Sequence, residues 1–319
     1  FQAEDGIRDR SPSRGLGDVY KRQPIAYLNG EHIPVSQATL PVYDSGVVLG
    51  ATVTEMTRTF GHQLFKLNDH LDRLFQALEY MRFDTGLTKK DFRQLSIEIV
   101  KNNAQWLDKE GDLGLTHFVT AGTFATYAKI SPEGPVNRPT VCMHTFPLPF
   151  SMWAEKLESG QQLVTPNIRH VPPQCYDPAI KNRSRLHYYL ADLEARRVVP
   201  GATALLLDMD DHVTETIAAN FIMVRGRTLI SPEIKNILPG ISRKTVFELA
   251  SNLGFQTVEQ DIPVEEVIEA DEAFTTSTSY CMMPVTHVNN APIGKGKPGP
   301  VYRTLIDAWS KQVGVNITT

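Results

Sequence analysis

The stretch "ATALLLDMDDHVTETIAANFIMVRGRTLISPEIKNILPGISR", Ala202–Arg243, alternates apolar runs with short turns and ends where a helix is expected. Apolar and β-branched residues dominate the runs, which predicts a meander of strands. The turns fall at Asp210-Asp211 and Arg225-Gly226, and the helix is expected after Pro239-Gly240. Strands that lead into a helix predict a mixed α/β or α+β fold.

Apolar patterns elsewhere in the chain predict further strands and helices. Residues 25–35 are typical of a β-hairpin that turns at the Asn-Gly pair. A helix is expected over 68–83, with Asn68 or Asp69 as its N-cap. Another is expected over 185–198. Its apolar face is predicted to consist of Leu186, Tyr189, Leu190 and Leu193.

Two prolines mark a change of pattern and predict an interdomain linker at 148–159. The linker would separate a smaller N-terminal α/β domain, 24–147, from a larger C-terminal α/β domain, 160–319. Residues 1–23 mix charges with Gly, Ser and Pro, and we expect them to be disordered. Their last part, "GDVYKRQ", resembles translated vector or adapter sequence, so this leader is a candidate for non-native sequence.

The composition indicates an ordinary globular protein. The chain has 319 residues, of which 41% are hydrophobic and 21% charged, with a net charge of -4. This charge balance argues against nucleic acid as a partner, and no apolar run is long enough to span a membrane. The three cysteines are widely spaced, which favours a reducing compartment, and we expect a cytoplasmic protein.

One lysine lies in an unusually positive segment, "DPAIKNRSRLHYY", Asp177–Tyr189. A helix start favours anions, so Lys181, followed by Arg183 and Arg185, is poorly placed for the helix dipole. The first interpretation is an exposed surface lysine, which is the usual state of this residue. The second is a neutral amine whose pKa is lowered by neighbouring cations, so that it acts as a nucleophile.

Other motifs indicate an anion site and no metal site. Free backbone N–H groups at the helix start near Gly240 and the Ser242 hydroxyl can hold a phosphate. The segment Asp208–His212 lacks the spacing of a calcium loop, and the nine histidines show no paired spacing for zinc. The chain contains no GxSxG motif, which argues against a serine hydrolase.

Six segments in order resemble the class IV (fold type IV) pyridoxal-phosphate aminotransferases, over about residues 26–312. This family includes branched-chain aminotransferases, D-amino acid transaminases, (R)-amine transaminases and aminodeoxychorismate lyase. The resemblance implies a two-domain fold with the cofactor, pyridoxal 5'-phosphate, at the domain interface. The segments are "YLNGEHIPVSQATLPVYDSGVVLG" (27–50), "HLDRL" (70–74), "IKN" (180–182), "VTETIAANF" (213–221), "LPGISR" (238–243) and "TSTSYCMMPV" (276–285).

The resemblance also implies a role for individual residues at the cofactor site. Lys181 would form a Schiff base with the cofactor, and Glu215 would pair with its pyridine nitrogen. Arg73 would hold the phosphate as a charge-assisted pair. The remaining cofactor contacts implied by the motifs are Leu238 against the ring, and Ile241, Ser242 and Thr278 at the phosphate.

The substrate pocket departs more from the family pattern. The arginine that D-amino acid transaminases use for the substrate carboxylate matches Ala121. Arg58, Arg183 or Arg185 could each supply a carboxylate partner instead, so the identity and stereochemistry of the amino donor stay open. The candidate substrate-binding residues are Leu49, Thr54, Arg58, His117, Arg183, Ser279 and Tyr280.

The sequence therefore predicts a transaminase that moves an amino group from an amino acid or a primary amine to a 2-oxo acid by a ping-pong mechanism. An aminodeoxychorismate lyase-type reaction on the same scaffold is the first alternative, because it would need the same lysine and glutamate. A non-catalytic module that binds pyridoxal phosphate is the second. The resemblance further implies a homodimer.

Overall fold

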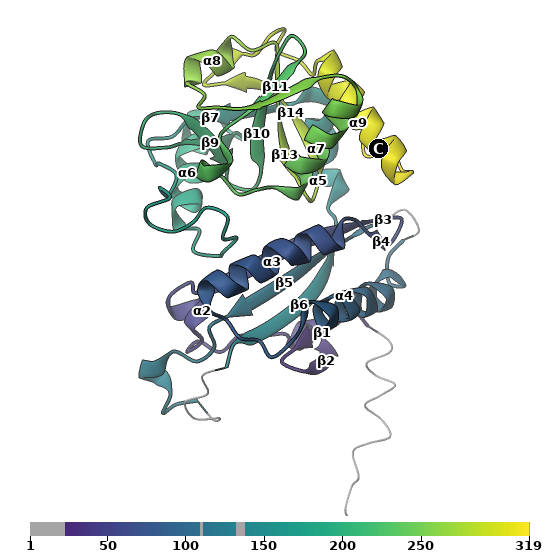
Figure 1. The fold of residues 1–319 in the computed structure, drawn as a ribbon, viewed down its shortest axis with the longest axis vertical. Coiled ribbons are helices and arrows are strands. Elements are labelled where there is room, and N and C mark those ends of the chain that lie inside the picture. Colours follow the sequence, from purple (N-terminus) through teal and green to yellow (C-terminus); the bar gives the residue numbers. More distant parts are fainter. Residues whose placement is uncertain (1–22, 109–110, 132–137, 319) are drawn as a thin grey trace, which may run out of the picture.

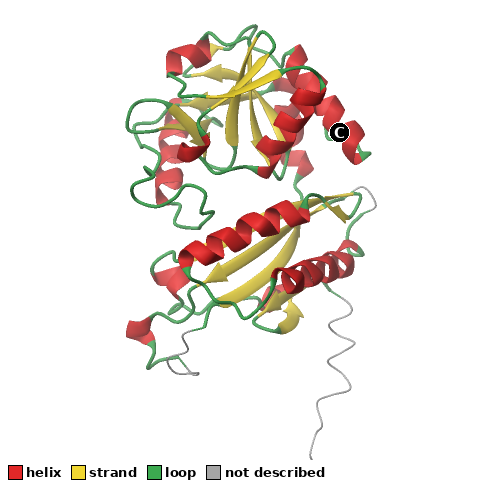
Figure 2. Cartoon of the chain, in the orientation of Figure 1, coloured by secondary structure: helices red, strands yellow, loops and turns green. Residues whose placement is uncertain are grey.

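The chain folds into two α/β units, one above the other in Figure 1, in a computed structural model that describes residues 23–108, 111–131 and 138–318. Each unit combines a sheet with helices packed against it (Figure 2), as the mixed α/β prediction requires. The expected disordered leader, 1–23, lies outside the described residues except for Gln23.

The first unit is built on a six-stranded antiparallel sheet with the order β2-β1-β6-β5-β3-β4. The expected hairpin turns at Asn29 and Gly30, which both have a positive φ. The strands are β1 (Ile25–Leu28), β2 (Glu31–Pro34), β3 (Thr52–Phe60), β4 (Gln63–Leu64), β5 (Leu113–Thr120) and β6 (Thr140–Pro147).

Helices α3 (Leu67–Met81) and α4 (Lys89–Ala104) pack against this sheet, and the short helix α2 (Ser45–Val48) precedes β3. Their apolar faces meet the strands in one core that includes Leu71, Leu74 and Phe92. The predicted N-cap of α3 is wrong. Lys66, in a left-handed conformation, precedes the helix without a side-chain cap, because the chain already turns helical at the buried Leu67.

The second unit contains nine strands, and most of them form a closed ring. The path β12-β11-β10-β13-β14-β7-β8-β9 returns on itself because β9 also pairs with β10, through Glu215 opposite Asn220. The strands are β7 (Gln161–Val164), β8 (Thr203–Leu207), β9 (Val213–Thr216), β10 (Asn220–Arg225), β11 (Thr228–Ser231), β12 (Gln256–Glu259), β13 (Glu272–Ser277), β14 (Cys281–Val288) and β15 (Ala291–Pro292).

Helices cover the outside of this ring. They are α6 (Leu186–Val198), α7 (Ile241–Asn252), α8 (Val264–Ile268) and α9 (Pro300–Val313). Helix α7 begins directly after Pro239-Gly240, as the sequence predicts. Apolar side chains from the strands fill one core, and a second core lies between the sheet and helices α7 and α9.

The predicted apolar face of α6 lies on the outside of the molecule. Leu186, Tyr189, Leu190 and Leu193 are 68%, 63%, 41% and 38% exposed. The helix instead buries Ala191, Asp192 and Ala195 against β8. Small residues allow the helix to approach the strand closely, which leaves the larger apolar side chains on the outside.

The segment between the two sheets is partly helical. Helix α5 (Phe150–Ser159) occupies most of the expected linker, 148–159, and packs against β14. The domain boundaries given above stay a prediction. Among the described residues, no helix combines the length and the apolar character needed to cross a membrane.

Candidate active site

A cavity of about 290 Å³ opens between the two units. Strands β3, β5 and β6 of the first unit contribute to its wall, together with the segment that precedes α6, the β9–β10 hairpin, the start of α7 and the end of β13. Its charged lining consists mainly of cations. Lys181, Arg73, Arg183 and Arg185 face a single carboxylate, that of Glu215. This surplus of positive charge suits an anionic ligand.

Lys181 is fixed by its backbone to the first unit. Its carbonyl accepts a hydrogen bond from Thr54 N at 2.8 Å, and Arg183 N donates to Thr52 Oγ1 at 2.8 Å. The adjacent Ile180 is part of the core of the first unit. Burial and the nearby Arg73 lower the pKa of Lys181 to about 8, so about a tenth of the amine is neutral at pH 7 and about half at pH 8. The nucleophile interpretation therefore fits this lysine better than that of a surface residue.

Arg73 is oriented by a buried carboxylate that the sequence reasoning missed. Its Nε and Nη2 donate to Glu55 at 2.8 Å and 2.7 Å, as a two-point pair. Burial alone would raise the pKa of Glu55, but Arg73 and the His70 ring hold it well below its usual value. Arg73 Nη1 also donates to Pro239 O at 2.7 Å, next to the start of α7.

Glu215 accepts hydrogen bonds on both carboxylate oxygens. Oε1 accepts from the Tyr188 hydroxyl at 2.8 Å, and Oε2 accepts from Asn220 Nδ2 at 2.9 Å and from Leu238 N at 3.3 Å. The pairing of β9 with β10 places Asn220 directly opposite Glu215. His170 Nε2 lies 3.4 Å from Oε1. The carboxylate is thus held in one orientation at the cavity wall.

The start of α7 offers unpaired backbone donors to the cavity. Gly240 is its N-cap, and no side chain caps this helix end. Ile241 and Ser242 line the cavity, where the N–H groups of a first helical turn have no partner within the helix. Thr276 and Ser277, the last two residues of β13, also line the cavity, and so do Thr278 and Ser279, which follow them.

The structure brings together all the expected cofactor residues at this cavity, but only part of the substrate set. Lys181, Arg73, Glu215, Leu238, Ile241, Ser242 and Thr278 all line it. Of the candidate substrate residues, Arg183 and Ser279 line it, and so does Arg185. The others do not. They are Leu49, Thr54, Arg58, His117 and Tyr280.

Arg58 is engaged elsewhere. Its Nε donates to Thr59 O at 3.0 Å, its Nη1 donates to Ser279 O at 2.9 Å, and its guanidinium lies 4.0 Å from the centre of the Phe60 ring. With 3% of its surface exposed, it has no access to the cavity as a carboxylate partner. Arg58 instead connects β3 to the segment that carries Ser279.

Of the remaining four side chains, three make polar contacts within the protein and one is exposed. The Thr54 hydroxyl donates to His117 O at 3.1 Å, and His117 Nε2 lies 2.7 Å from Ser96 Oγ. Burial lowers the pKa of His117 to about 4. The Tyr280 hydroxyl lies 3.0 Å from Thr275 Oγ1, and its ring packs edge-on against that of Trp153. Leu49 is exposed and does not line the cavity.

Several lining or supporting residues were missed by the sequence reasoning. Glu55, His170, Tyr188, Asn220 and Thr276 belong to this group. Asn220 and Thr276 stand inside quoted motifs, so their place in those motifs was a signal. His170 and Tyr188 follow no spacing rule, because they approach Glu215 only through the fold.

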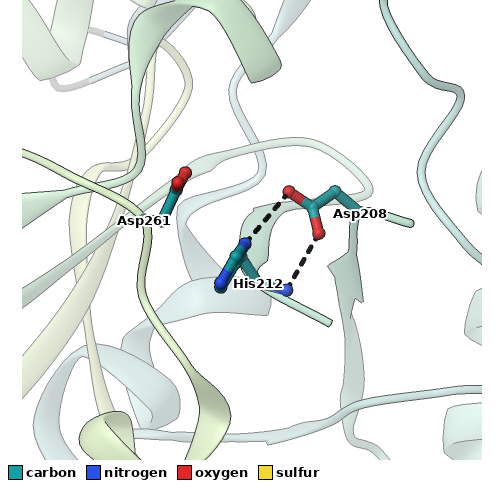
Figure 3. Close-up of side chains that lie close together, drawn as sticks. All are labelled: Asp208, His212 and Asp261. Atoms are coloured by element: carbon teal, nitrogen blue, oxygen red, sulfur yellow. Dashed lines mark hydrogen bonds and ion pairs between the residues drawn. The ribbon is translucent and has the colours of Figure 1, made fainter. Parts of the chain in front are cut away.

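A second group of polar side chains, outside the lining of this cavity, lies around the β8–β9 turn (Figure 3). Ligand atoms of Asp208, His212 and Asp261 come within 4.8 Å of one another. The Asp208 carboxylate already accepts from the backbone N–H groups of Asp210 and His212, both at 2.9 Å. These bonds describe the ordinary hairpin turn that the sequence predicts.

Comparisons with known proteins agree with this geometry. A family model described as "Amino-transferase class IV" matches residues 52–288. The "branched-chain-amino-acid aminotransferase-like protein 1" of Arabidopsis thaliana is 32% identical over 292 residues, which make up 90% of this chain and 50% of that protein. This chain thus spans half the length of that relative.

Two further proteins are similar over nearly their full length. A D-alanine aminotransferase of Bacillus licheniformis is 26% identical over 287 residues, which cover 90% of this chain and 96% of that protein. The solved structure of a branched-chain amino acid aminotransferase of Escherichia coli matches with a TM-score of 0.81 at 23% identity, over 92% of this chain and 95% of that chain. The latter supports the fold.

Proposed function

This chain belongs to the class IV aminotransferase family, and on that premise we propose that it transfers an amino group from an amino acid or a primary amine to a 2-oxo acid, with pyridoxal 5'-phosphate as cofactor. The observation that carries the proposal is one cavity that joins Lys181, with its lowered pKa, to Glu215 and to the free start of α7.

The residues of the cavity fit this cofactor. Thr276 Oγ1 is buried at the cavity and has no hydrogen-bond partner among the described residues, as expected of a group that awaits a ligand. The N–H groups of Ile241 and Ser242 and the outer edge of Arg73 would hold the phosphate. Glu215 has about four acceptor positions, and three are filled, which leaves one for a ring N–H group.

When bound, pyridoxal phosphate supplies a carbonyl carbon for the amine and a ring that takes up electrons from the substrate. The protein binds, orients and moves a proton. Lys181 Nζ in its neutral form would be the nucleophile. The same atom would take a proton from the substrate carbon and return it two atoms away, which amounts to a 1,3-proton shift. Two half-reactions in succession, first with the donor and then with the 2-oxo acid, complete the transfer.

Arg183 and Arg185 are the proposed partners of the substrate carboxylate. Both line the cavity, and among the described residues neither is paired with a carboxylate. Arg185 lies over the Tyr188 ring, at 5.0 Å from its centre. We expect Arg183→Ala and Arg185→Ala to lower kcat/KM for amino acid donors by about tenfold or more, and to affect primary amines without a carboxylate much less.

We also propose that the protein is a homodimer. The exposed face of α6 is the supporting observation, because contiguous apolar patches on a surface mark interaction sites. A second copy of the chain is the occupant that the family resemblance implies. A cytoplasmic location stays a prediction.

The central test is covalent capture of the cofactor. The purified protein should be yellow, and borohydride should bleach it and fix the cofactor to Lys181, as peptide mapping by mass spectrometry would show. The Lys181→Ala protein should bind pyridoxal phosphate without fixing it. Covalent capture by that variant would show that another residue is the nucleophile.

A panel of amino donors with several 2-oxo acids then tests the reaction. Transfer to at least one 2-oxo acid is expected. Release of pyruvate from aminodeoxychorismate, with no transfer in the panel, would instead identify a lyase. A protein that binds the cofactor at Lys181 but turns over neither would be the non-catalytic module.

A further inference from the structure

A continuous set of hydrogen bonds, here called the His170 relay, connects His170 through Tyr188 to Glu215. The Nδ1 atom of His170 lies 3.0 Å from Val171 O. Its Nε2 atom lies 2.9 Å from the Tyr188 hydroxyl oxygen. That hydroxyl in turn donates to Glu215 Oε1 at 2.8 Å. Two elements and one loop thus meet at the relay: α6 carries Tyr188, β9 carries Glu215, and the segment after β7 carries His170.

The protons that these contacts require can be counted. A carbonyl oxygen only accepts, so Nδ1 must carry a proton. An ionised carboxylate also only accepts, so the single hydroxyl proton of Tyr188 points at Glu215. The hydroxyl oxygen is then left to accept, and Nε2 must carry a proton too. A ring with a proton on both nitrogens is an imidazolium ion.

A neutral His170 would leave two acceptors facing each other at one of these contacts. With the proton on Nε2, the bare Nδ1 would face the carbonyl at 3.0 Å. With the proton on Nδ1 instead, Nε2 would carry none. The Tyr188 hydroxyl would then have one proton for two contacts, one to Nε2 and one to the Glu215 carboxylate. The imidazolium also lies 3.4 Å from Glu215 Oε1, where opposite charges attract.

The groups around the relay are compatible with this charge. Burial and Glu215 raise the pKa of Tyr188 well above its usual value, so its hydroxyl keeps the proton. Burial, followed by the proximity of His170, lowers the pKa of His187 to about 4, so that ring is neutral. Several cations oppose this charge. They are Arg185, which is stacked over the Tyr188 ring, and the other cations of the cavity lining, Lys181, Arg73 and Arg183; Arg169 is paired with Asp211.

We propose that His170 is an imidazolium at neutral pH and acts through Tyr188 as a positioning residue for Glu215. The relay fixes the direction of each proton, so that Glu215 can only accept. Its partner in the cavity must then be a donor. This last step rests on the proposed function, because the donor would be the protonated ring nitrogen of the cofactor. The charge on His170 is independent of the proposed function.

The charge can be measured on the full chain by ¹⁵N NMR of labelled histidine, with and without pyridoxal phosphate. At pH 7.5 a free imidazole is about nine-tenths neutral. We expect His170, assigned by the loss of its signal in His170→Gln, to show two protonated nitrogens at this pH. One unprotonated nitrogen would overturn the proposal. Should His170→Gln fail to fold, the shift of the same signal in Tyr188→Phe, which removes one oxygen, provides the assignment.

The positioning role needs a second readout. We expect His170→Gln and Tyr188→Phe to weaken pyridoxal phosphate binding by about 2- to 10-fold, and to change the pH profile of the bound cofactor's absorption spectrum. His187→Gln is the matched control, because its ring packs against Tyr188 but stands outside the relay, and it should leave that profile unchanged. Identical profiles in all three variants and the parent would refute the positioning role. A protein that fails to transfer amino groups would leave the NMR result standing.

Discussion

At the scale of single residues, the charged side chains around the cavity differ in whether they have a partner. Arg73 is paired with Glu55, and Glu215 is held by Tyr188 and Asn220. Lys181 has no such partner within the part of the chain that the structure describes, and burial together with Arg73 lowers its pKa to about 8. Its reactivity therefore depends on pH within the range in which proteins are handled.

The first prediction concerns the pH dependence of Lys181. Only the neutral amine attacks, so the rate at which cofactor-free protein captures pyridoxal phosphate should rise with pH through about 8 and level off above it. Stopped-flow absorbance between pH 6 and pH 10 measures this rate. A rise centred near the ordinary lysine pKa of about 10.4 would contradict the low value.

The second prediction concerns the buried Glu55. Glu55→Gln would leave Arg73 buried without its counter-charge and should lower the free energy of unfolding by about 3 kcal/mol at pH 7. The folded pKa of Glu55 is depressed, so its contribution is present above the unfolded value of about 4.3 and is lost as the pH falls through the folded value.

Urea unfolding of both proteins at pH 7 and near pH 3.5 tests this prediction. The difference in unfolding free energy between parent and variant should shrink at the lower pH. Glu98→Gln, a substitution of an exposed glutamate on α4, is the control and should be nearly neutral at both. A difference that does not change with pH would mean that Glu55 acts by packing alone.

At the scale of elements, α7 shows how a helix start is kept open. Gly240 adopts an ordinary extended conformation with φ −65°, so its backbone does not require glycine. The neighbouring side chain does, because a Cβ at this position would lie 1.9 Å from Asn220 Oδ1. The same Asn220 holds both Glu215 and Leu238 O.

The third prediction is that Gly240→Ala displaces the Asn220 amide. It should cost about 1–3 kcal/mol of stability and weaken pyridoxal phosphate binding, because Glu215 loses one of its donors. Thermal unfolding and a fluorescence titration with the cofactor measure the two effects. The control is Gly201→Ala, where no atom lies near the added Cβ, although its positive φ carries a strain of its own. Unchanged cofactor affinity in Gly240→Ala would mean that Asn220 does not orient Glu215.

The sequence predicts elements better than it predicts which way they face. Binary patterning and turn signals located α3, α6 and α7 and the hairpin at Asn29. On α6 the pattern identified an apolar face without saying whether the chain itself or another molecule covers it. It gave no sign of Glu55, the buried partner on β3 that orients Arg73.

The sequence also predicted the cofactor residues of the candidate site better than its substrate residues. Cofactor residues that stand in motifs reached the cavity, because those motifs fix local geometry at a helix start, a strand end or a lysine loop. Arg58, His117 and Tyr280 did not, because polar side chains near a motif can equally hold a strand to a neighbouring helix or turn. His170 and Tyr188 required the full fold.

At the scale of the whole molecule, the two units are joined where the site lies. Thr54 N binds Lys181 O, and Arg73 binds Pro239 O. Lys244 pairs with Asp69 at 2.8 Å across the same junction. Neither unit holds the complete cavity, so the arrangement of the two units determines whether the site exists.

The fourth prediction concerns assembly. Leu190→Glu and Leu193→Glu would place charges on the exposed face of α6, and they should convert the proposed homodimer to monomer. Light scattering after size-exclusion chromatography measures the mass. Leu253→Glu, at the end of α7, is the matched control, because Leu253 is 38% exposed, the same fraction as Leu193. If the parent protein is already monomeric, or if both variants remain dimers, the interface lies elsewhere or does not form.

The closed ring of the second unit has a consequence for the time at which the protein matures. The ring is complete only when β14 lies beside β7, a strand more than a hundred residues earlier in the chain. Thr278 and Ser279 stand directly before β14, whereas Lys181 stands soon after β7. A ribosome must therefore have released the chain through β14 before these residues meet. Under the proposed function, a growing chain would be colourless until β14 has emerged, and the yellow of bound cofactor would follow only then.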